Sequence, residues 1–245
     1  MSNPGYIALS RMIAQQRALD VRAANIANVS TPGYKAETVN FSDYLVRQTG
    51  VKTPSGGRTV AMVTDRASWR DFSQGELSKT GNALDLAIQG EGFFAVQTPR
   101  GERYTRAGRF TLSPAGQIVD GSGNAVLGVD GHPLSVPAGD ASIGVSSDGT
   151  VSTESGELGK LRIMQFDNQE ALQGEGNLLF ASAQPGHQAE QPTVAQGAVE
   201  GTNIQGVAEL TKMMNDLREF EYASQFADAE AQREQNAIDK IGHKT

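Results

Sequence analysis

Apolar residues near the start of the chain recur at the spacing of an amphipathic helix. They are Tyr6, Leu9, Met12, Ile13, Leu19, Ala23 and Ile26, with Gln16 at the one interruption. Asn3 followed by Pro4 is typical of a helix start, because asparagine caps free N–H groups and proline suits the first helical position. Pro32 cannot continue a helix and Gly33 permits a sharp turn. The pattern predicts a helix over about residues 4–28.

A second helical pattern fills the C-terminal part of the chain, over about residues 202–241. Its apolar positions are Val207, Leu210, Met213, Met214, Leu217, Phe220, Ala223, Phe226, Ala227, Ile238 and Ile241. Residues 1–35 hold four bases and one acid, whereas residues 207–245 hold five bases and eight acids, so the two ends attract. One amphipathic helix cannot bury its apolar side alone. Either the two helices pack against each other, or each packs against the middle of the chain.

The residues between the two helices change to the alternating pattern of short strands. Apolar side chains recur at every second position in residues 84–88 and 94–98. Asp-Gly pairs that begin at Asp120, Asp130 and Asp148 mark tight turns, because glycine tolerates the positive φ that such turns need. The pattern indicates a β-rich region of short strands whose topology the sequence does not reveal.

Composition removes several classes of function. The 245 residues include no cysteine, so disulfides, thiolate metal sites and cysteine nucleophiles are excluded. A formal net charge of −7 gives the chain no electrostatic reason to bind nucleic acid or an anionic membrane. No apolar run approaches the roughly 20 residues of a membrane span. The start of the chain also lacks the apolar stretch of about 7–15 residues found in signal peptides, which by itself favours the cytoplasm.

No group of residues indicates catalysis, a cofactor or a metal. Gly90–Gly92 begins like a phosphate-binding loop, but no matching pattern follows, so a tight turn is the simpler interpretation. Asp85 and Glu91 flank a strand without a third group to support acid–base chemistry. The histidines lie far apart in loop or tail contexts, at His132, His187 and His243. We therefore predict a protein that is not an enzyme and that has no catalytic residue, cofactor or metal site.

Three blocks of sequence carry a more specific signature. The first, residues 23–35, ends in Thr-Pro-Gly-Tyr-Lys; the second comprises residues 84–96 and 104–110; the third, residues 200–221, includes Thr-Asn-Ile. Together they resemble the axial proteins of the bacterial flagellum, the rod–hook family. The chain departs from the family pattern at Ala24, where asparagine is usual, and in Thr-Asn-Ile, where Ser-Asn-Val is usual.

The resemblance implies a structural subunit of the flagellar basal-body rod. Such subunits polymerise into a helical tube that transmits torque and conducts exported subunits. The length resembles that of the two mid-sized rod proteins, and the opening residues 6–10 together with Phe220-Glu221 favour the proximal-rod member. The distal-rod member, or another hook or rod protein, is the alternative.

The resemblance also implies where the chain acts and with what. It would leave the cytoplasm through the flagellar type III export apparatus without a cleaved signal peptide and reside in the periplasmic rod. Its partners would be copies of itself, the distal-rod protein and the small proximal-rod subunits, with no nucleic acid and no insertion into a membrane. Its terminal helices would be disordered in the monomer and fold on assembly.

The predicted fold class is α+β. The N- and C-terminal helices would pair as an antiparallel coiled coil, with an inserted β-rich middle domain. Residues 1–35 and 197–245 would form the discontinuous helical domain, residues 36–75 an extended connector, and residues 76–196 the β-rich domain.

The assembly interface is expected on the two helices and at the turn that follows the first. Its candidate residues are Leu9, Ile13, Leu19, Asn25, Ile26, Asn28, Thr31, Pro32, Gly33, Tyr34, Asn203, Val207, Leu210, Met213, Met214, Leu217, Phe220 and Phe226. Without the resemblance, Asn25 and Asn28 would be an ordinary helix stop. The competing class of function is a free β-rich binding module or carbohydrate-active enzyme, which requires folded ends in the monomer and a concave polar site.

Overall fold

The chain divides into two compact units, each built from segments far apart in the sequence. The computed structural model describes residues 3–47, 59–140 and 142–242. Unit 1 comprises Met1–Ala27, Glu37–Arg70 and Gln205–Thr245, and unit 2 comprises Asn28–Ala36 and Asp71–Ile204, as far as these segments are described. Part of the predicted connector, residues 48–58, lies outside the described residues.

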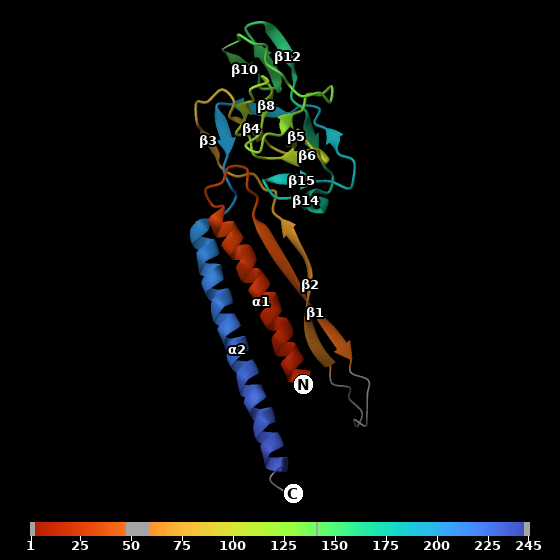
Figure 1. Ribbon diagram of the computed structural model, residues 1–245, viewed down its shortest axis with the longest axis vertical. Helices are drawn as coiled ribbons and strands as arrows, with labels where there is room; N and C mark the ends of the chain where they lie inside the picture. Colours follow the sequence, from red (N-terminus) through yellow and green to blue (C-terminus); the bar gives the residue numbers. More distant parts are fainter. Residues whose placement is uncertain (1–2, 48–58, 141, 243–245) are drawn as a thin grey trace. The chain divides into compact units, whose positions relative to one another are not determined.

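Unit 1 consists of two helices and one hairpin. Helix α1 (Asn3–Ala27) runs beside helix α2 (Gly206–Gly242), and the antiparallel strands β1 (Glu37–Arg47) and β2 (Thr59–Arg70) lie along the other side of α1 (Figure 1). The hairpin register shifts once, between Asn40 and Phe41, as at a β-bulge. Helix α1 therefore contacts both a helix and a hairpin. None of the described helices is long and apolar enough to span a membrane.

The predicted α+β fold with a coiled-coil helical domain is wrong. The described residues form only two α-helices, and most of the remaining elements are β. A coiled coil buries large apolar side chains in its seam, but Ile13 is 63% exposed and Met214 is 55% exposed. Among the helical side chains that the structure describes, the buried ones are small or polar instead: Ala14, Gln15, Asn25, Glu209, Ala223 and Glu230. The helical apolar stripes were read correctly, but the structure does not pair them with each other.

Unit 2 is built from short antiparallel strands. Its elements are β3 (Leu77–Lys79), β4 (Leu86–Gln89), β5 (Phe93–Thr98), β6 (Gly101–Thr105), β7 (Thr111–Leu112), β8 (Ile118–Val119), β9 (Ala125–Val126), β10 (Ile143–Val145), β11 (Thr150–Thr153), β12 (Gly156–Lys160), β13 (Ile163–Gln165), the 3₁₀ turn Gln169–Ala171, β14 (Gln173–Gly174), β15 (Leu179–Ala181), β16 (His187–Gln188), β17 (Thr193–Gln196) and β18 (Ala198–Glu200). The largest sheet runs β14-β15-β6-β5-β9-β8-β7, with β13 joined to β5 and β16 joined to β13. Strands β10, β11 and β12 form a separate sheet.

Strand β5 separates two apolar clusters. Successive side chains of a strand point to opposite faces, so Phe94 and Val96 enter one cluster while Phe93 and Ala95 enter the other. All four are fully buried, which explains why this strand reads as a continuous apolar run. The ring of Phe94 meets that of Phe110 edge-on at 5.2 Å between centroids, within the range in which aromatic pairs attract.

The last strands of unit 2 return to its first strands. Strand β17 pairs with β4, and β18 pairs with β3, both antiparallel. The chain therefore closes unit 2 by bringing residues near position 200 beside residues near position 77. This closure places the end of β18 next to the segment that follows α1 in the sequence, through a hydrogen bond from the Gly33 N–H to the Glu200 carbonyl oxygen.

Candidate assembly interface

The turn that follows α1, residues 28–34, is called the elbow here. Its first part is an ordinary turn in which the Thr31 N–H donates to the Asn28 carbonyl oxygen at 3.0 Å and the Thr31 hydroxyl donates to the Asn28 side-chain oxygen at 3.2 Å. Gly33 then adopts a φ of +74°, and a Cβ at this position would overlap the backbone of Ala107. Only glycine tolerates this positive φ and also leaves room for the Ala107 backbone. Gly33 therefore lets the elbow pass close to Ala107 within unit 2.

Asn25 joins the last turn of α1 to the start of β1 within unit 1. Its side-chain amide donates to the Glu37 carbonyl oxygen at 2.8 Å, and its side-chain oxygen accepts from the Glu37 N–H at 3.0 Å. The side chain is buried. The Asn25 side chain therefore pairs with both backbone groups of Glu37, as a neighbouring strand would. Its contacts lie within one subunit.

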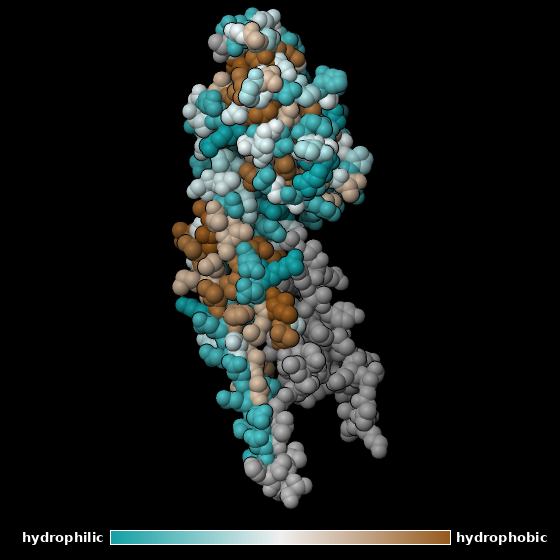
Figure 2. All heavy atoms as spheres, in the orientation of Figure 1, coloured by the Kyte–Doolittle hydropathy of each residue, from teal (hydrophilic) through white to brown (hydrophobic). Residues whose placement is uncertain are grey.

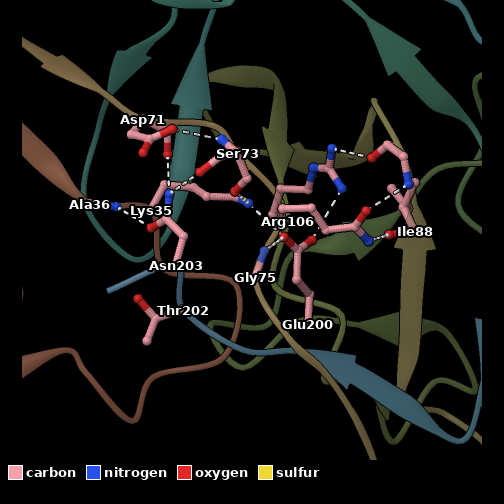
Figure 3. A network of polar contacts seen from close by, with 12 residues as sticks. Lys35, Ala36, Asp71, Ser73, Gly75, Ile88, Arg106, Glu200, Thr202 and Asn203 are labelled. Atoms are coloured by element: carbon pink, nitrogen blue, oxygen red, sulfur yellow. Dashed lines mark hydrogen bonds and ion pairs between the residues drawn. The ribbon is translucent and has the colours of Figure 1, made fainter. Parts of the chain in front are cut away.

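Asn203 makes a corresponding contact within unit 2. Its side-chain oxygen accepts from the Ala36 N–H at 2.9 Å, and its amide donates to the Asp71 carbonyl oxygen at 2.7 Å and to the Ser73 hydroxyl at 3.0 Å (Figure 3). One side chain thus holds two backbone segments that the sequence places 35 residues apart, at Ala36 and Asp71.

A buried cluster of three charged side chains lies beside Asn203, and the sequence did not single it out. Lys35, Arg106 and Glu200 are between 0% and 3% exposed. The Lys35 ammonium contacts one Glu200 carboxylate oxygen at 2.5 Å, and the Arg106 guanidinium contacts the other at 3.1 Å (Figure 3). We call these three residues the charge triad.

Backbone groups give each member of the charge triad a further partner. Lys35 donates to the Ser73 carbonyl oxygen at 2.7 Å, Glu200 accepts from the Gly75 N–H at 3.0 Å, and Arg106 donates to the Gly90 carbonyl oxygen at 2.7 Å. Buried charges require such partners, because an unpaired charge loses its hydration without compensation. The triad therefore ties Lys35, the residue that follows the elbow, to the segment at residues 73–75 and to strand β18.

Burial shifts the pKa values of the two cations. Loss of hydration lowers the pKa of Lys35 and that of Arg106, while the negative charge of Glu200 opposes the shift in both. Because one carboxylate faces two cations, the triad carries a formal charge of +1. Removing Glu200 would leave two buried cations without their shared counter-ion.

The large apolar side chains of the helices face outward. Among the described side chains, those exposed by 40–82% are Leu9, Ile13, Val207, Leu210, Met214, Leu217, Tyr222 and Phe226. Figure 2 shows apolar side chains gathered over the first part of α2, whereas the later part of the helix is polar. The remaining candidates on the helices, Leu19, Ile26, Met213 and Phe220, are half-buried. At the elbow, Asn28, Thr31 and Pro32 are half-buried and Tyr34 is buried.

Ion pairs join the two helices where the apolar stripes do not. Arg22 of α1 contacts Glu209 at 3.1 Å and Asp216 at 3.3 Å, both on α2. Burial alone would raise the pKa of Glu209, but the hydrogen bond from Lys212 and the charge of Arg22 outweigh it and hold that pKa below its ordinary value. These contacts use part of the opposite charge of the two terminal segments.

The two carboxylates considered above for acid–base chemistry, Asp85 and Glu91, differ in their environment. Asp85 is buried and accepts a hydrogen bond from Asn82, whereas Glu91 is exposed. His243 lies outside the described residues. Within the described ranges, no group of three or more His, Asp or Glu side chains could hold a metal ion.

Comparison with known families identifies the chain. Residues 6–35 match the family described as flagella basal body rod protein, and residues 87–153 match the D1 domain of the flagellar hook proteins FlgE, FlgF and FlgG. The flagellar basal-body rod protein FlgF of Caulobacter vibrioides is 35% identical over 99% of both chains. The chain belongs to the flagellar basal-body rod protein family. FlgF of Mesorhizobium japonicum is 32% identical over 100% of both chains, and the rod protein FlgG of Bacillus subtilis is 32% identical over 88% of this chain and 90% of its own.

Membership of the rod protein family confirms the resemblance read from the three sequence blocks, including the preference for a FlgF-like member. The chain is a structural subunit of the flagellar basal-body rod. Its relatives are structural rod proteins rather than enzymes. Nothing in these relatives supports the competing interpretation as a free binding module or carbohydrate-active enzyme. Each of the three blocks also supplies one member of the charge triad: Lys35, Arg106 and Glu200.

Proposed function

We propose that this subunit occupies the proximal rod and polymerises into a helical tube that transmits torque and conducts exported subunits. Support comes from relatives named FlgF that align over the whole chain. A tube of this kind needs contacts between different patches of neighbouring subunits, because such contacts extend without closing on themselves. Copies of this chain, the distal-rod protein and the small proximal-rod subunits would be the neighbours.

The observation that carries the proposal is the outward apolar stripe on the two helices of unit 1. Several large exposed apolar side chains on neighbouring elements mark a surface that another protein covers. Each large side chain that a neighbour buries fully would contribute roughly 1.5–3 kcal/mol. The stripe residues Leu9, Ile13, Val207, Leu210, Met214, Leu217 and Phe226 would contact neighbours directly.

The buried members of the candidate interface would act indirectly. Asn25, Gly33 and Asn203 make their contacts within the subunit and fix the backbone around the elbow. The functional division would then be residues 1–35 and 197–245 as the assembly domain, residues 36–75 as a connector that also contacts neighbours, and residues 76–196 as the outer domain.

We also infer the route and the chemistry of the subunit. It would reach the periplasmic rod through the flagellar type III export apparatus, and its helices would complete their folding on assembly. A net charge of −7 gives it no attraction to nucleic acid or to an anionic membrane. The function would be mechanical, without catalysis.

Counting subunits in the native assembly tests the proposal. Hook–basal bodies purified from the native host would be analysed by quantitative mass spectrometry with isotope-labelled peptides. A few copies per body support the proximal rod. A several-fold higher number would favour the distal rod, the position suggested by the FlgG relatives. Complete absence would overturn the proposal.

A further inference from the structure

A pocket opens on the surface of unit 2 beside the elbow. Its volume is about 340 Å³, and its walls include Pro32, Ala107, Arg109, Ser122 and Leu178. The surface that these walls present is mainly apolar. We call it the elbow pocket.

Arg109 supplies the charge of the elbow pocket. The residue is exposed, and in the described ranges it forms no ion pair. Asp120 also lines the pocket, but it is buried and its oxygens accept hydrogen bonds from the Ser122 N–H and from the backbone and side-chain amide groups of Asn124. A ligand would therefore meet an apolar surface and one available cation.

One wall of the pocket is held in an unusual backbone conformation. Asn177 and Leu178 have φ values of +49° and +61°, a region that a leucine side chain disfavours. The Leu178 carbonyl oxygen accepts from the Thr105 hydroxyl at 2.9 Å, and the Leu179 N–H donates to Gly176 at 2.9 Å. Strained residues that the surroundings hold in place cluster at functional sites. The pocket is thus formed before any ligand arrives.

We propose that the elbow pocket binds the turn at residues 128–132 of a second copy of this chain. Val129 and Asp130 would be the residues that enter it. The turn closes through the Gly131 N–H, which donates to the Gly128 carbonyl oxygen at 2.9 Å, and the His132 N–H donates to one Asp130 carboxylate oxygen at 3.1 Å. Both Val129 and Asp130 are exposed. Val129 matches the apolar walls, and Asp130 carries the charge that Arg109 attracts.

The choice of occupant follows from what unit 2 exposes. Its exposed large apolar side chains in the described ranges are Val29, Leu112 and Val129. Only Val129 has an acidic neighbour in the sequence, because Val29 lies between Asn28 and Ser30 and Leu112 between Thr111 and Ser113. The apolar stripe of unit 1 is a poorer match, because it is spread along helices about 10–12 Å wide rather than presented on a turn.

The contact also has the form that a rod requires. The residues of the elbow pocket and those of the 128–132 turn do not overlap, so the contact joins two different patches and can repeat from copy to copy. This inference rests on the proposed function and adds a contact through unit 2 to the helical contacts. With this contact, neighbouring copies would touch through unit 2 as well as through their helices.

Disulfide trapping in assembled rods tests the contact. The chain has no cysteine, so the double variant Ser122→Cys/His132→Cys carries one thiol at the pocket and one at the turn and keeps Arg109, Val129 and Asp130. Basal bodies from cells that carry this variant in place of the wild type are oxidised and separated on a non-reducing gel. We expect a ladder of covalent multimers. Each single-cysteine variant, and Ser122→Cys/Ser155→Cys with its second thiol on the β11–β12 turn, should give none.

The outcomes separate the two proposals. If the double variant is incorporated without forming a ladder, or if the Ser155 control forms the same ladder, the pocket contact is wrong while the rod function stands. If the wild-type chain is absent from basal bodies, the proposed function fails and the contact fails with it.

A charge exchange provides a second readout that needs no cross-link. Arg109→Glu and Asp130→Arg should each lower the amount of the chain in purified basal bodies about tenfold, because like charges would meet in the contact. Arg109→Glu combined with Asp130→Arg should restore it. Circular dichroism of each purified variant verifies that unit 2 is folded. A combined variant no better than the single ones would overturn the contact.

Discussion

Lys35 and Glu200 lie 165 positions apart in the chain and form an ion pair that is almost completely shielded from solvent. Arg106 shares the same carboxylate. The three residues come from three separate sequence blocks, so the charge triad is a point at which the fold of unit 2 is closed. The contribution of the triad to the free energy of unfolding can be measured directly.

Glu200→Gln should destabilise the protein strongly. The change leaves Lys35 and Arg106 buried without their counter-ion, and breaking a buried pair from one side costs about 3–5 kcal/mol. Urea unfolding followed by fluorescence measures the loss. Glu157→Gln, at an exposed position, is the control and should change the free energy of unfolding little. Equal stability of the two variants would show that the triad does not hold unit 2 together.

Gly33→Ala should cost more stability than Gly81→Ala. Both glycines have a positive φ, +74° and +78°, so an alanine is strained at either position by roughly 1–2 kcal/mol. Only at Gly33 would the added Cβ overlap a neighbouring backbone, that of Ala107, whereas no atom lies near a Cβ at Gly81. The difference in thermal unfolding between the two variants isolates the close approach of the elbow to the backbone of Ala107. Identical shifts would contradict it.

The contact between α1 and α2 should weaken in acid. The pKa of Glu209 is held below its ordinary value of 4.5, so its contribution to stability is complete above that value and is lost as the pH falls through the lower folded pKa. Thermal unfolding followed by helical circular dichroism between pH 6 and pH 3 measures the loss. Glu209→Gln should be less stable at pH 6 and show a smaller decrease on acidification. An unchanged pH dependence in this variant would exclude Glu209 as the group responsible.

Substitutions on the apolar stripe should affect assembly and leave the isolated subunit unchanged. Leu210→Asn and Met214→Asn alter exposed positions, so unfolding of the monomer should shift little. Each lost apolar contact between subunits would cost about 1.5 kcal/mol or more, which is about tenfold in affinity. The double variant should be depleted from purified basal bodies. Thr211→Asn, an exposed polar position on the same turn, is the matched control and should assemble normally.

The sequence revealed the regular elements better than the contacts among them. The helix predicted over residues 4–28 is α1 (Asn3–Ala27), because periodicity and the Thr-Pro-Gly stop are local signals. Helix α2 begins at Gly206, a few residues after the predicted start, because Asn203 uses its side chain to hold Ala36 and Asp71.

The coiled coil was predicted wrongly and the charge triad was not predicted, because local sequence patterns do not identify the partners of a residue. An apolar stripe indicates that a helix has a partner but does not identify it, and here the hairpin and small or polar helical residues fill the inner face of α1. Lys35, Arg106 and Glu200 each resemble ordinary surface charges in the sequence. They meet because segments distant in the sequence pack together in unit 2: Glu200 ends β18, Lys35 follows the elbow, and Arg106 follows β6. The assignment of the stripe residues to an assembly interface stays a prediction.

The separation of Lys35 from Glu200 also imposes an order of events on folding. Contacts between residues distant in sequence form only after the long loop between them has been closed. Whichever end of the chain leaves a narrow passage first, most of it must emerge before these two side chains can meet. Unit 2 therefore cannot close around a chain that is still in transit. If the subunit is exported through a narrow channel, as proposed, the Lys35–Glu200 ion pair can form only after most of the chain has emerged.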